Sequence, residues 1–173
     1  CRASRSVGDQ REAQVAMSRL HLTRPEELRD DQRALYASIT TGPRAQGPQH
    51  FALTNEDGSL VGPFNALLVS PALGGALQEL GAAVRYSTRL TARTREIAIL
   101  IVATHWNSAF ERMAHEAVGR AAGLSEDELA ALRAGVLPEL SDSHELACAR
   151  LVTALVDGDV DDALWASTRA LLD

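Results

Sequence analysis

The residues best suited to acid–base chemistry gather in one stretch of the chain, residues 93–123. They are two carboxylates and two imidazoles: Glu96, His105, Glu111 and His115. Carboxylates and imidazoles are the side chains that most often move protons in enzymes. We therefore expect these four residues to meet around one pocket.

Glu111 and His115 are four residues apart, a spacing that puts both side chains on one face of a helix. A carboxylate beside an imidazole orients the ring and raises its basicity, so the two residues form a plausible acid–base pair. The helix is expected to start near Asn107 and Ser108, either of which can cap it. Backbone N–H groups at a helix start favour anions, so a substrate carboxylate or enolate could lie beside the pair.

Each of these residues also has a simpler interpretation. Glu96 falls in an apolar helix, where a charge needs a partner or a raised pKa, and a surface salt bridge to Arg93 or Arg120 would supply the partner. A single helical histidine is often only a packed or a surface residue. A metal site built from these imidazoles and carboxylates is less favoured, because the surroundings are aliphatic and the HExxH motif is absent.

The spacing of apolar residues is helical throughout, and no stretch alternates with the period of two that a strand requires. We therefore predict an all-α fold with one domain, residues 17–173. Residues 1–16 are interpreted as a disordered N-terminal extension or a cloning remnant, with Met17 as the natural start. Helices are expected over about 25–39, 71–87, 92–105, 108–123, 125–135, 141–156 and 159–172.

Several helix starts can be predicted from capping residues. Thr23 is expected to cap the first helix with Glu26 reaching back, Thr91 to cap the helix that carries Glu96, and Ser125 and Glu128 to form a capping box. Apolar residues predict an inward face for the first helix, formed by Leu28, Ala34, Leu35 and Ile39. They also predict an apolar stripe along one side of the second helix, formed by Leu73, Leu77, Leu80 and Val84.

Composition excludes several classes of function. The net charge is −6 without a basic block, so a nucleic-acid partner is not expected. The longest apolar run, Ile97–Ala103, is far too short to span a membrane. All 17 basic residues are arginines, which excludes a Schiff-base lysine and a P-loop. The two cysteines form no CxxC pair, and Cys148 is expected to be buried. We expect a cytoplasmic protein that acts on a small molecule without a cofactor or a metal.

From Phe64 onward the chain resembles the carboxymuconolactone decarboxylase family, which includes alkylhydroperoxidase D-type proteins. The resemblance is carried by GPFNALLVSP (Gly62–Pro71), RTREIAIL (Arg93–Leu100) and FERMAHEAVGRAAGLSEDELAAL (Phe110–Leu132). It implies an alkylhydroperoxidase D-like helical bundle. It also implies a homo-oligomer, typically a trimer or a trimer-based hexamer, with the pocket near the subunit contacts.

The peroxidase branch of that family carries a glutamate, eleven residues, Cys-x2-Cys, three residues and a histidine. Glu96 and His115 match the glutamate and the histidine, whereas Ser108 and Glu111 stand at the two cysteine positions. Thiol peroxidases need a thiolate to attack the peroxide. An alkylhydroperoxidase or peroxiredoxin-type antioxidant activity is therefore disfavoured.

The proton-handling residues that remain favour cofactor-free acid–base chemistry, either decarboxylation or proton transfer, on a small carboxylate or lactone. Such a protein would be a carboxy-lyase, or an isomerase or lactone-processing enzyme. The expected roles are general acid/base for His115, orientation for Glu111, tuning for Glu96, and binding or relay for His105. The expected substrate-binding residues are Trp106, Ser108 and Phe64. The alternative is a non-catalytic oligomeric binding protein with the same fold.

Overall fold

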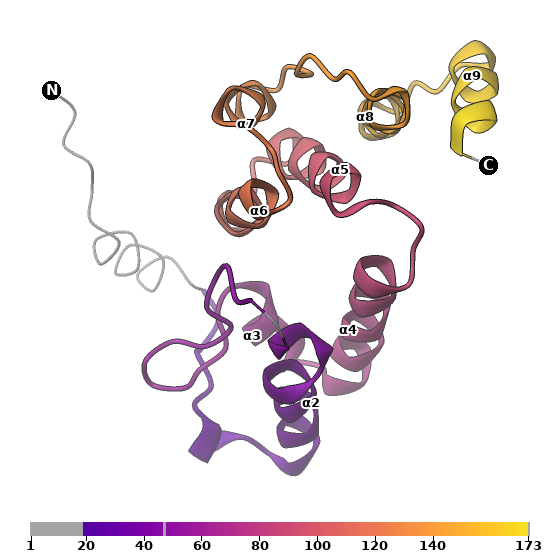
Figure 1. The fold of residues 1–173 in the computed structure, drawn as a ribbon. Coiled ribbons are helices and arrows are strands. Elements are labelled where there is room, and N and C mark those ends of the chain that lie inside the picture. The colour runs from indigo at the N-terminus through magenta and orange to yellow at the C-terminus, as the bar shows by residue number, and fades with distance from the viewer. Residues whose placement is uncertain (1–18, 47, 173) are drawn as a thin grey trace, which may run out of the picture. The chain divides into compact units, whose positions relative to one another are not determined.

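The structure is a computed structural model, which describes residues 19–46 and 48–172. In these ranges the regular elements are helices, apart from one isolated antiparallel bridge between Thr54 and Leu60, so the prediction of an all-α fold is confirmed (Figure 1). The elements are the 3-10 helices η1 (Pro25–Glu27) and η2 (Pro43–Ala45), and α2 (Asp30–Thr41), α3 (Pro63–Leu67), α4 (Pro71–Tyr86), α5 (Ala92–His105), α6 (Ala109–Ala121), α7 (Glu126–Arg133), α8 (Ser143–Asp157) and α9 (Asp162–Leu172). The expectations for residues 1–16 and for Met17 fall outside the described residues.

The described residues divide into two compact units, one that ends at residue 82 and one that begins at residue 83. That residues 17–173 form one domain stays a prediction from the sequence. The boundary falls near the end of α4, which we describe with the first unit. All the residues of the candidate acid–base cluster belong to the second unit.

The first α-helix begins later than the sequence predicts, at Asp30. Thr23 does not cap it, because a 3-10 turn intervenes. Within that turn Glu27, rather than Glu26, reaches back, and its carboxylate accepts a hydrogen bond of 2.9 Å from the backbone N–H of Arg24. Of the residues predicted to point inward, the buried ones are Leu28, Leu35 and Ile39, and the exposed one is Ala34. One position of an α-helix turns it by about 100°, which carries Ala34 off the buried face.

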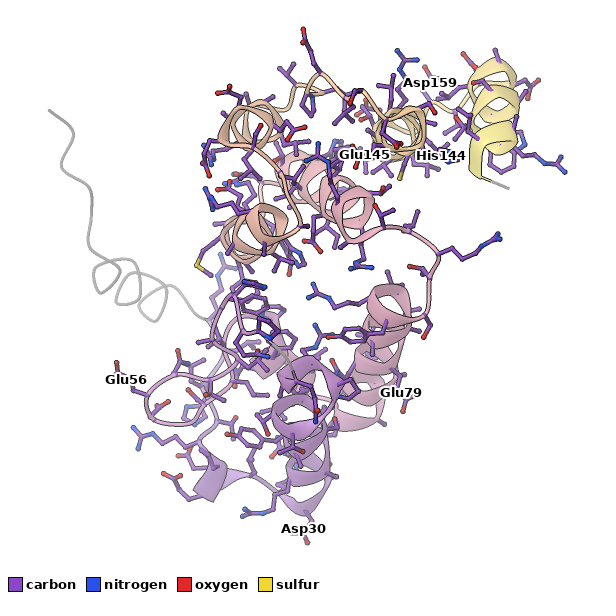
Figure 2. All side chains as sticks on the ribbon, viewed as in Figure 1. Asp30, Glu56, Glu79, His144, Glu145 and Asp159 are labelled. Atoms are coloured by element: carbon purple, nitrogen blue, oxygen red, sulfur yellow. The ribbon has the colours of Figure 1, made fainter. Side chains whose placement is uncertain are left out.

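The apolar stripe that the sequence predicts along α4 is exposed. All four of its members are exposed: Leu73, Leu77, Leu80 and Val84. The helix packs instead through Gly74 and Gln78. A Cβ at Gly74 would lie 2.3 Å from the backbone oxygen of Leu67, so the absence of a side chain is what allows the close approach. Glu79 extends into solvent from the same helix (Figure 2), so α4 exposes both apolar and charged side chains.

Helix α5 is the central element of the second unit. It contacts α6, α7 and α8, and α9 packs on α8 (Figure 1). The bounds of α5 are those predicted, and Thr91 caps it by accepting a hydrogen bond of 3.0 Å from the backbone N–H of Thr94. The core around it consists of Ile97, Leu100, Ile101, Leu124, Leu129, Leu132 and Ala149. This burial holds the polar residues of α5 in fixed positions.

Short connections set the helices around α5. Asn107 adopts a φ of 50° between α5 and α6, which is a left-handed conformation. Ser108 is the N-cap of α6, but its side chain makes no capping hydrogen bond. The predicted capping box of α7 is present: Ser125 accepts from the backbone N–H of Glu128, whose carboxylate accepts from the backbone N–H of Ser125.

Candidate functional site

The imidazole of His115 is the centre of a buried polar cluster in the second unit. The ring lies in the middle of α6, and its Nδ1 is 2.6 Å from Oε2 of Glu96 on α5. Glu96 is fully buried and His115 is 7% exposed. An ionised carboxylate can only accept, so Nδ1 carries a hydrogen and donates it. Glu96 therefore fixes the orientation of the ring, and Nε2 is the nitrogen left available to exchange a proton.

Nε2 of His115 faces the second carboxylate of the cluster. Its distance to Oε2 of Glu111 is 3.3 Å, and the two residues are one turn apart on α6. The side chain of Glu111 is 38% exposed, in contrast to that of Glu96. A small molecule would therefore reach the imidazole from the side of Glu111.

The pKa of His115 is set by opposing effects. Burial lowers it, because the charged ring loses its hydration. Hydrogen bonds with Glu111 and Glu96, together with the charge of Glu96, act in the other direction and outweigh burial. The pKa of His115 is consequently raised above its ordinary value of 6.5. This shift moves the ring towards its protonated form at neutral pH, as a general acid requires.

One oxygen of Glu96 is left open. Its Oε1 is buried without a hydrogen-bond partner, and Nε of Arg95, 3.8 Å away, is likewise buried without one. Arg93 and Arg120, the salt-bridge partners considered above for Glu96, bind other carboxylates. The sequence did not single out Arg95, because neighbouring residues of a helix do not normally face each other. The cluster thus contains a buried acceptor that forms no hydrogen bond, although the Arg95 cation lies close to it.

His105 lies apart from this cluster. The nine positions between it and Glu96 turn an α-helix by about 900°, which is two and a half turns, so the two residues lie on opposite sides of α5. Nδ1 of His105 is 3.5 Å from Oδ1 of Asp157 on α8. The structure therefore brings together Glu96, Glu111 and His115, and it leaves out His105.

The three residues expected to bind substrate lie in different surroundings. Trp106 is 71% exposed, and its ring meets that of His105 edge to face, with the ring centres 5.1 Å apart. Ser108 stands at the start of α6, which also carries His115. Phe64 belongs to the first unit, where it is buried and the guanidinium of Arg44 lies 5.1 Å from the centre of its ring. Trp106 accompanies His105 rather than the cluster of three.

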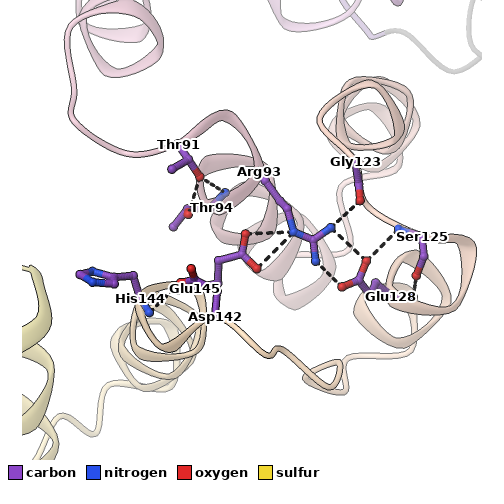
Figure 3. Close-up of polar contacts among 9 residues, drawn as sticks. All are labelled: Thr91, Arg93, Thr94, Gly123, Ser125, Glu128, Asp142, His144 and Glu145. Atoms are coloured by element: carbon purple, nitrogen blue, oxygen red, sulfur yellow. Dashed lines mark hydrogen bonds and ion pairs between the residues drawn. The ribbon is translucent and has the colours of Figure 1, made fainter.

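Arg93, one turn before Glu96 on α5, forms a second polar cluster (Figure 3). Its guanidinium binds the carboxylate of Glu128 on α7 and, through Nε at 2.9 Å, that of Glu145 on α8. It also donates to the backbone oxygen of Gly123 beyond the end of α6. One side chain of α5 therefore ties together the segments that surround that helix.

Neither a metal site nor a membrane span is found in the described part of the chain. Residues 19–46 and 48–172 contain no group of three or more His, Cys, Asp or Glu side chains arranged to hold a metal ion. No helix within the same ranges has the length and apolar character needed to cross a bilayer.

Comparisons with models of protein families, with curated proteins and with solved structures give no match for this chain. The resemblance to carboxymuconolactone decarboxylases therefore rests on the sequence segments quoted above. The geometry around His115 is independent of that resemblance.

Proposed function

We propose that this is a carboxymuconolactone decarboxylase-like protein that performs cofactor-free decarboxylation or proton transfer on a small carboxylate or lactone. One observation carries the proposal: the buried ring of His115 is held between Glu96 at Nδ1 and Glu111 at Nε2. All three residues fall within the segments that resemble the family.

The geometry supports roles for the two glutamates that differ from those expected from the sequence. Glu96 orients the ring, because it is the buried partner and the closer one. Glu111 shares the mobile proton. A neutral ring would point the lone pair of Nε2 at the oxygen of Glu111, so either the ring or this carboxyl must carry a proton. A base and an acid are thus present at the same place.

The proton moves through Nε2 of His115 in either reaction. In proton transfer, Nε2 takes a proton from a carbon beside the substrate carbonyl, the electrons of the C–H bond form an enolate, and the protonated ring returns the proton to another carbon. In decarboxylation, the C–C bond to the carboxylate breaks and CO2 leaves. The electron pair of that bond stays on the substrate as an enolate, which Nε2–H protonates. The electron pair stays on the substrate in both cases, so no redox partner is required.

The homo-oligomer, a trimer or a hexamer, is part of the same proposal. The exposed stripe of α4 supports it, because contiguous apolar surface commonly marks an interaction site. Analytical ultracentrifugation of the unaltered protein and of a Leu77→Asp variant would test this. The variant should sediment as a smaller species, and an unaltered protein that sediments as a monomer would contradict the proposal.

A thiol peroxidase is the weaker reading of the same resemblance. Cys148 is buried in α8, and burial raises the pKa of its thiol, which is the wrong direction for a reactive thiolate. Ser108 and Glu111 stand where that branch has its cysteines. Acid–base chemistry requires only residues that the chain has, whereas a thiol peroxidase requires the two cysteines that it lacks at these positions.

The proposal can be tested with a panel of small β-keto acids and carboxylated lactones in D2O. Proton NMR would follow both the loss of CO2 and the exchange of C–H for C–D. A His115→Gln variant should lower the rate by about 100-fold or more, as expected for loss of a general acid/base. His144→Gln is the matched control, because His144 is an exposed histidine at the start of α8 (Figure 2) and should leave the rate unchanged.

Two outcomes separate the candidate functions. Turnover by the unaltered protein that survives His115→Gln would contradict the acid–base proposal. Binding of a panel member without turnover, lost in His115→Gln, would favour the non-catalytic binding protein. Retention of the far-UV circular dichroism spectrum is required of each variant before the comparison is made.

A further inference from the structure

Arg95 is a largely buried arginine that donates no hydrogen bond to any residue of the described chain. It directly precedes Glu96 on α5, and its side chain is 16% exposed. A guanidinium has five N–H donors, and leaving such donors unpaired inside a protein is unfavourable. The proposed function gives roles to Glu96, Glu111 and His115, but it does not explain this neighbouring cation.

Arg93, on the same helix, shows how one guanidinium can hold two carboxylates. Its Nε donates to Glu145 at 2.9 Å, and its two Nη nitrogens donate to the two oxygens of Glu128. In Arg95 the Nε edge likewise faces a carboxylate, because Nε lies 3.8 Å from Oε1 of Glu96. The other edge, formed by its two Nη nitrogens, contacts no carboxylate of the described residues. That edge can therefore accept a second carboxylate.

The two Nη nitrogens are also the part of Arg95 that a ligand can reach. Of the three guanidinium nitrogens, only Nε is both buried and unpaired. Since the Nη nitrogens have no partner among the described residues either, they must be open to solvent, and they contribute to the exposed part of the side chain. A ligand would therefore contact the Nη edge of Arg95 and leave Nε facing Glu96.

Arg95 and Glu111 extend in opposite directions from the contact between Glu96 and His115. After a short connection α6 runs back alongside α5 (Figure 1), so an earlier position on α5 lies level with a later position on α6. Arg95 precedes Glu96 on α5, whereas Glu111 precedes His115 on α6. An anionic ligand beside the ring would therefore turn its negative group towards Arg95 and away from Glu111.

We propose that Arg95 binds the carboxylate group of the substrate through its two Nη nitrogens, and that it thereby selects anionic substrates for the site around His115. The planar guanidinium matches a carboxylate with two parallel N–H···O bonds, as it does between Arg93 and Glu128. The inference rests on the proposed function only in taking His115 as the group that reacts with the substrate.

Isobutyrate and isobutyramide test the binding step without requiring turnover, because they share one shape and differ in charge. NMR spectra of the full chain would follow the Nε–H signal of Arg95 and the ring signals of His115. Isobutyrate should shift both sets of signals with one Kd on the order of 1 mM. Isobutyramide should bind at least about tenfold more weakly, because charge-assisted hydrogen bonds are lost. Equal binding of the two compounds, no binding of isobutyrate, or a shift at Arg95 without one at His115 overturns the proposal.

Three variants test the side chain itself. Arg95→Gln should weaken isobutyrate binding at least about tenfold, and Arg95→Lys should recover part of the affinity because it keeps the charge without the planar fork. Arg150→Gln is the matched control, since it removes the same charge from an exposed position of α8 and should leave binding unchanged. Each variant must retain the far-UV circular dichroism spectrum. Unchanged isobutyrate binding in both Arg95 variants overturns the assignment.

Kinetics separate this inference from the proposed function. With a carboxylate substrate, Arg95→Gln should raise KM about tenfold and change kcat by less than about threefold, as expected for loss of a binding contact. Turnover that requires His115 but keeps its KM in Arg95→Gln overturns the role of Arg95 and leaves the proposed function standing. Isobutyrate binding that requires Arg95, in a protein that turns over no substrate, supports the binding role of Arg95 and contradicts the proposed function.

Discussion

Helix α5 carries two ionic clusters one turn apart, and they differ in how completely they are bonded. Arg93 is surrounded by acceptors, namely Glu128, Glu145 and the backbone oxygen of Gly123 (Figure 3). One oxygen of Glu96 contacts His115, and the other is buried without a hydrogen bond, 3.8 Å from Nε of Arg95. The first cluster is closed and the second is open, although the same helix positions both.

The two clusters also differ in their cations, which are the guanidinium of Arg93 in the closed cluster and the imidazole of His115 in the open one. Guanidinium is effectively always charged, and the hydrogen bonds that Arg93 donates to Glu128 raise the pKa of Arg93 further. Imidazole can release its proton, and the hydrogen bonds with the flanking carboxylates raise the pKa of His115. A cation that cannot titrate ties helices together, whereas a cation that can titrate is able to exchange its proton.

Removing the closed cluster should have the largest effect on stability. Arg93→Met leaves Glu128 and Glu145 without their shared cation, and breaking one side of such a largely buried pair costs about 3 kcal/mol. Urea denaturation would measure this loss in the free energy of unfolding. Arg133→Met is the control: Arg133 binds Glu116 at the surface with its side chain 49% exposed, and the loss should stay below about 1 kcal/mol. Equal losses in the free energy of unfolding for the two variants would show that the closed cluster contributes no more than a surface ion pair.

The open cluster should make stability depend on pH. The folded-state pKa of His115 is raised above 6.5, so its contribution is fully present below pH 6.5 and is lost as pH rises through the raised value. Urea denaturation across that range should show stability falling with increasing pH. In the His115→Gln variant, this part of the dependence of stability on pH should be missing. An identical dependence in both proteins would show that the pKa of His115 is not raised.

Weakening the helix that carries both clusters should separate stability from proton chemistry. Thr91→Ala removes the N-cap of α5, which typically costs about 1 kcal/mol. The pKa of His115, measured by NMR titration of its ring, should not change. A shift of that pKa would mean that the start of α5 and the open cluster are coupled.

The smallest change in stability is expected at the exposed carboxylate of the open cluster. Glu111→Gln should alter the free energy of unfolding by no more than about 0.5 kcal/mol, as is usual for exposed positions. It should nevertheless lower the pKa of His115, because a hydrogen bond to the charged ring is weakened. Glu116→Gln on the same helix is the control and should leave the titration of the ring unaltered.

Local signals predicted much of the fold. Capping residues placed the starts of α5 and α7, at Thr91 and Ser125, because a cap acts within one turn. The spacing of Glu111 and His115 placed both on one face of α6 for the same reason. Such contacts depend on a few neighbouring residues, so the sequence displays them directly.

Contacts between distant segments were not predictable in this way. Arg93 meets Glu128 and Glu145 across 35 and 52 positions, and nothing in the local pattern selects those partners. The stripe of α4 is apolar at helical spacing, yet Gly74 decides which face packs, because it admits a neighbouring backbone. The separation of His105 from the cluster could have been predicted, because helical geometry alone puts it on the side of α5 opposite Glu96.

The left-handed backbone of Asn107 has a consequence for the open cluster. Hydrogen bonds from the backbone N–H groups of Asn107 to Thr104 and of Ser108 to Ala103 close the end of α5 as a Schellman motif. Mirror-image torsion at this single α-carbon reverses the course of the chain and returns α6 alongside α5. L-residues with branched side chains resist that torsion. The approach of His115 on α6 to Glu96 on α5 therefore depends on the backbone conformation of a residue that belongs to neither helix.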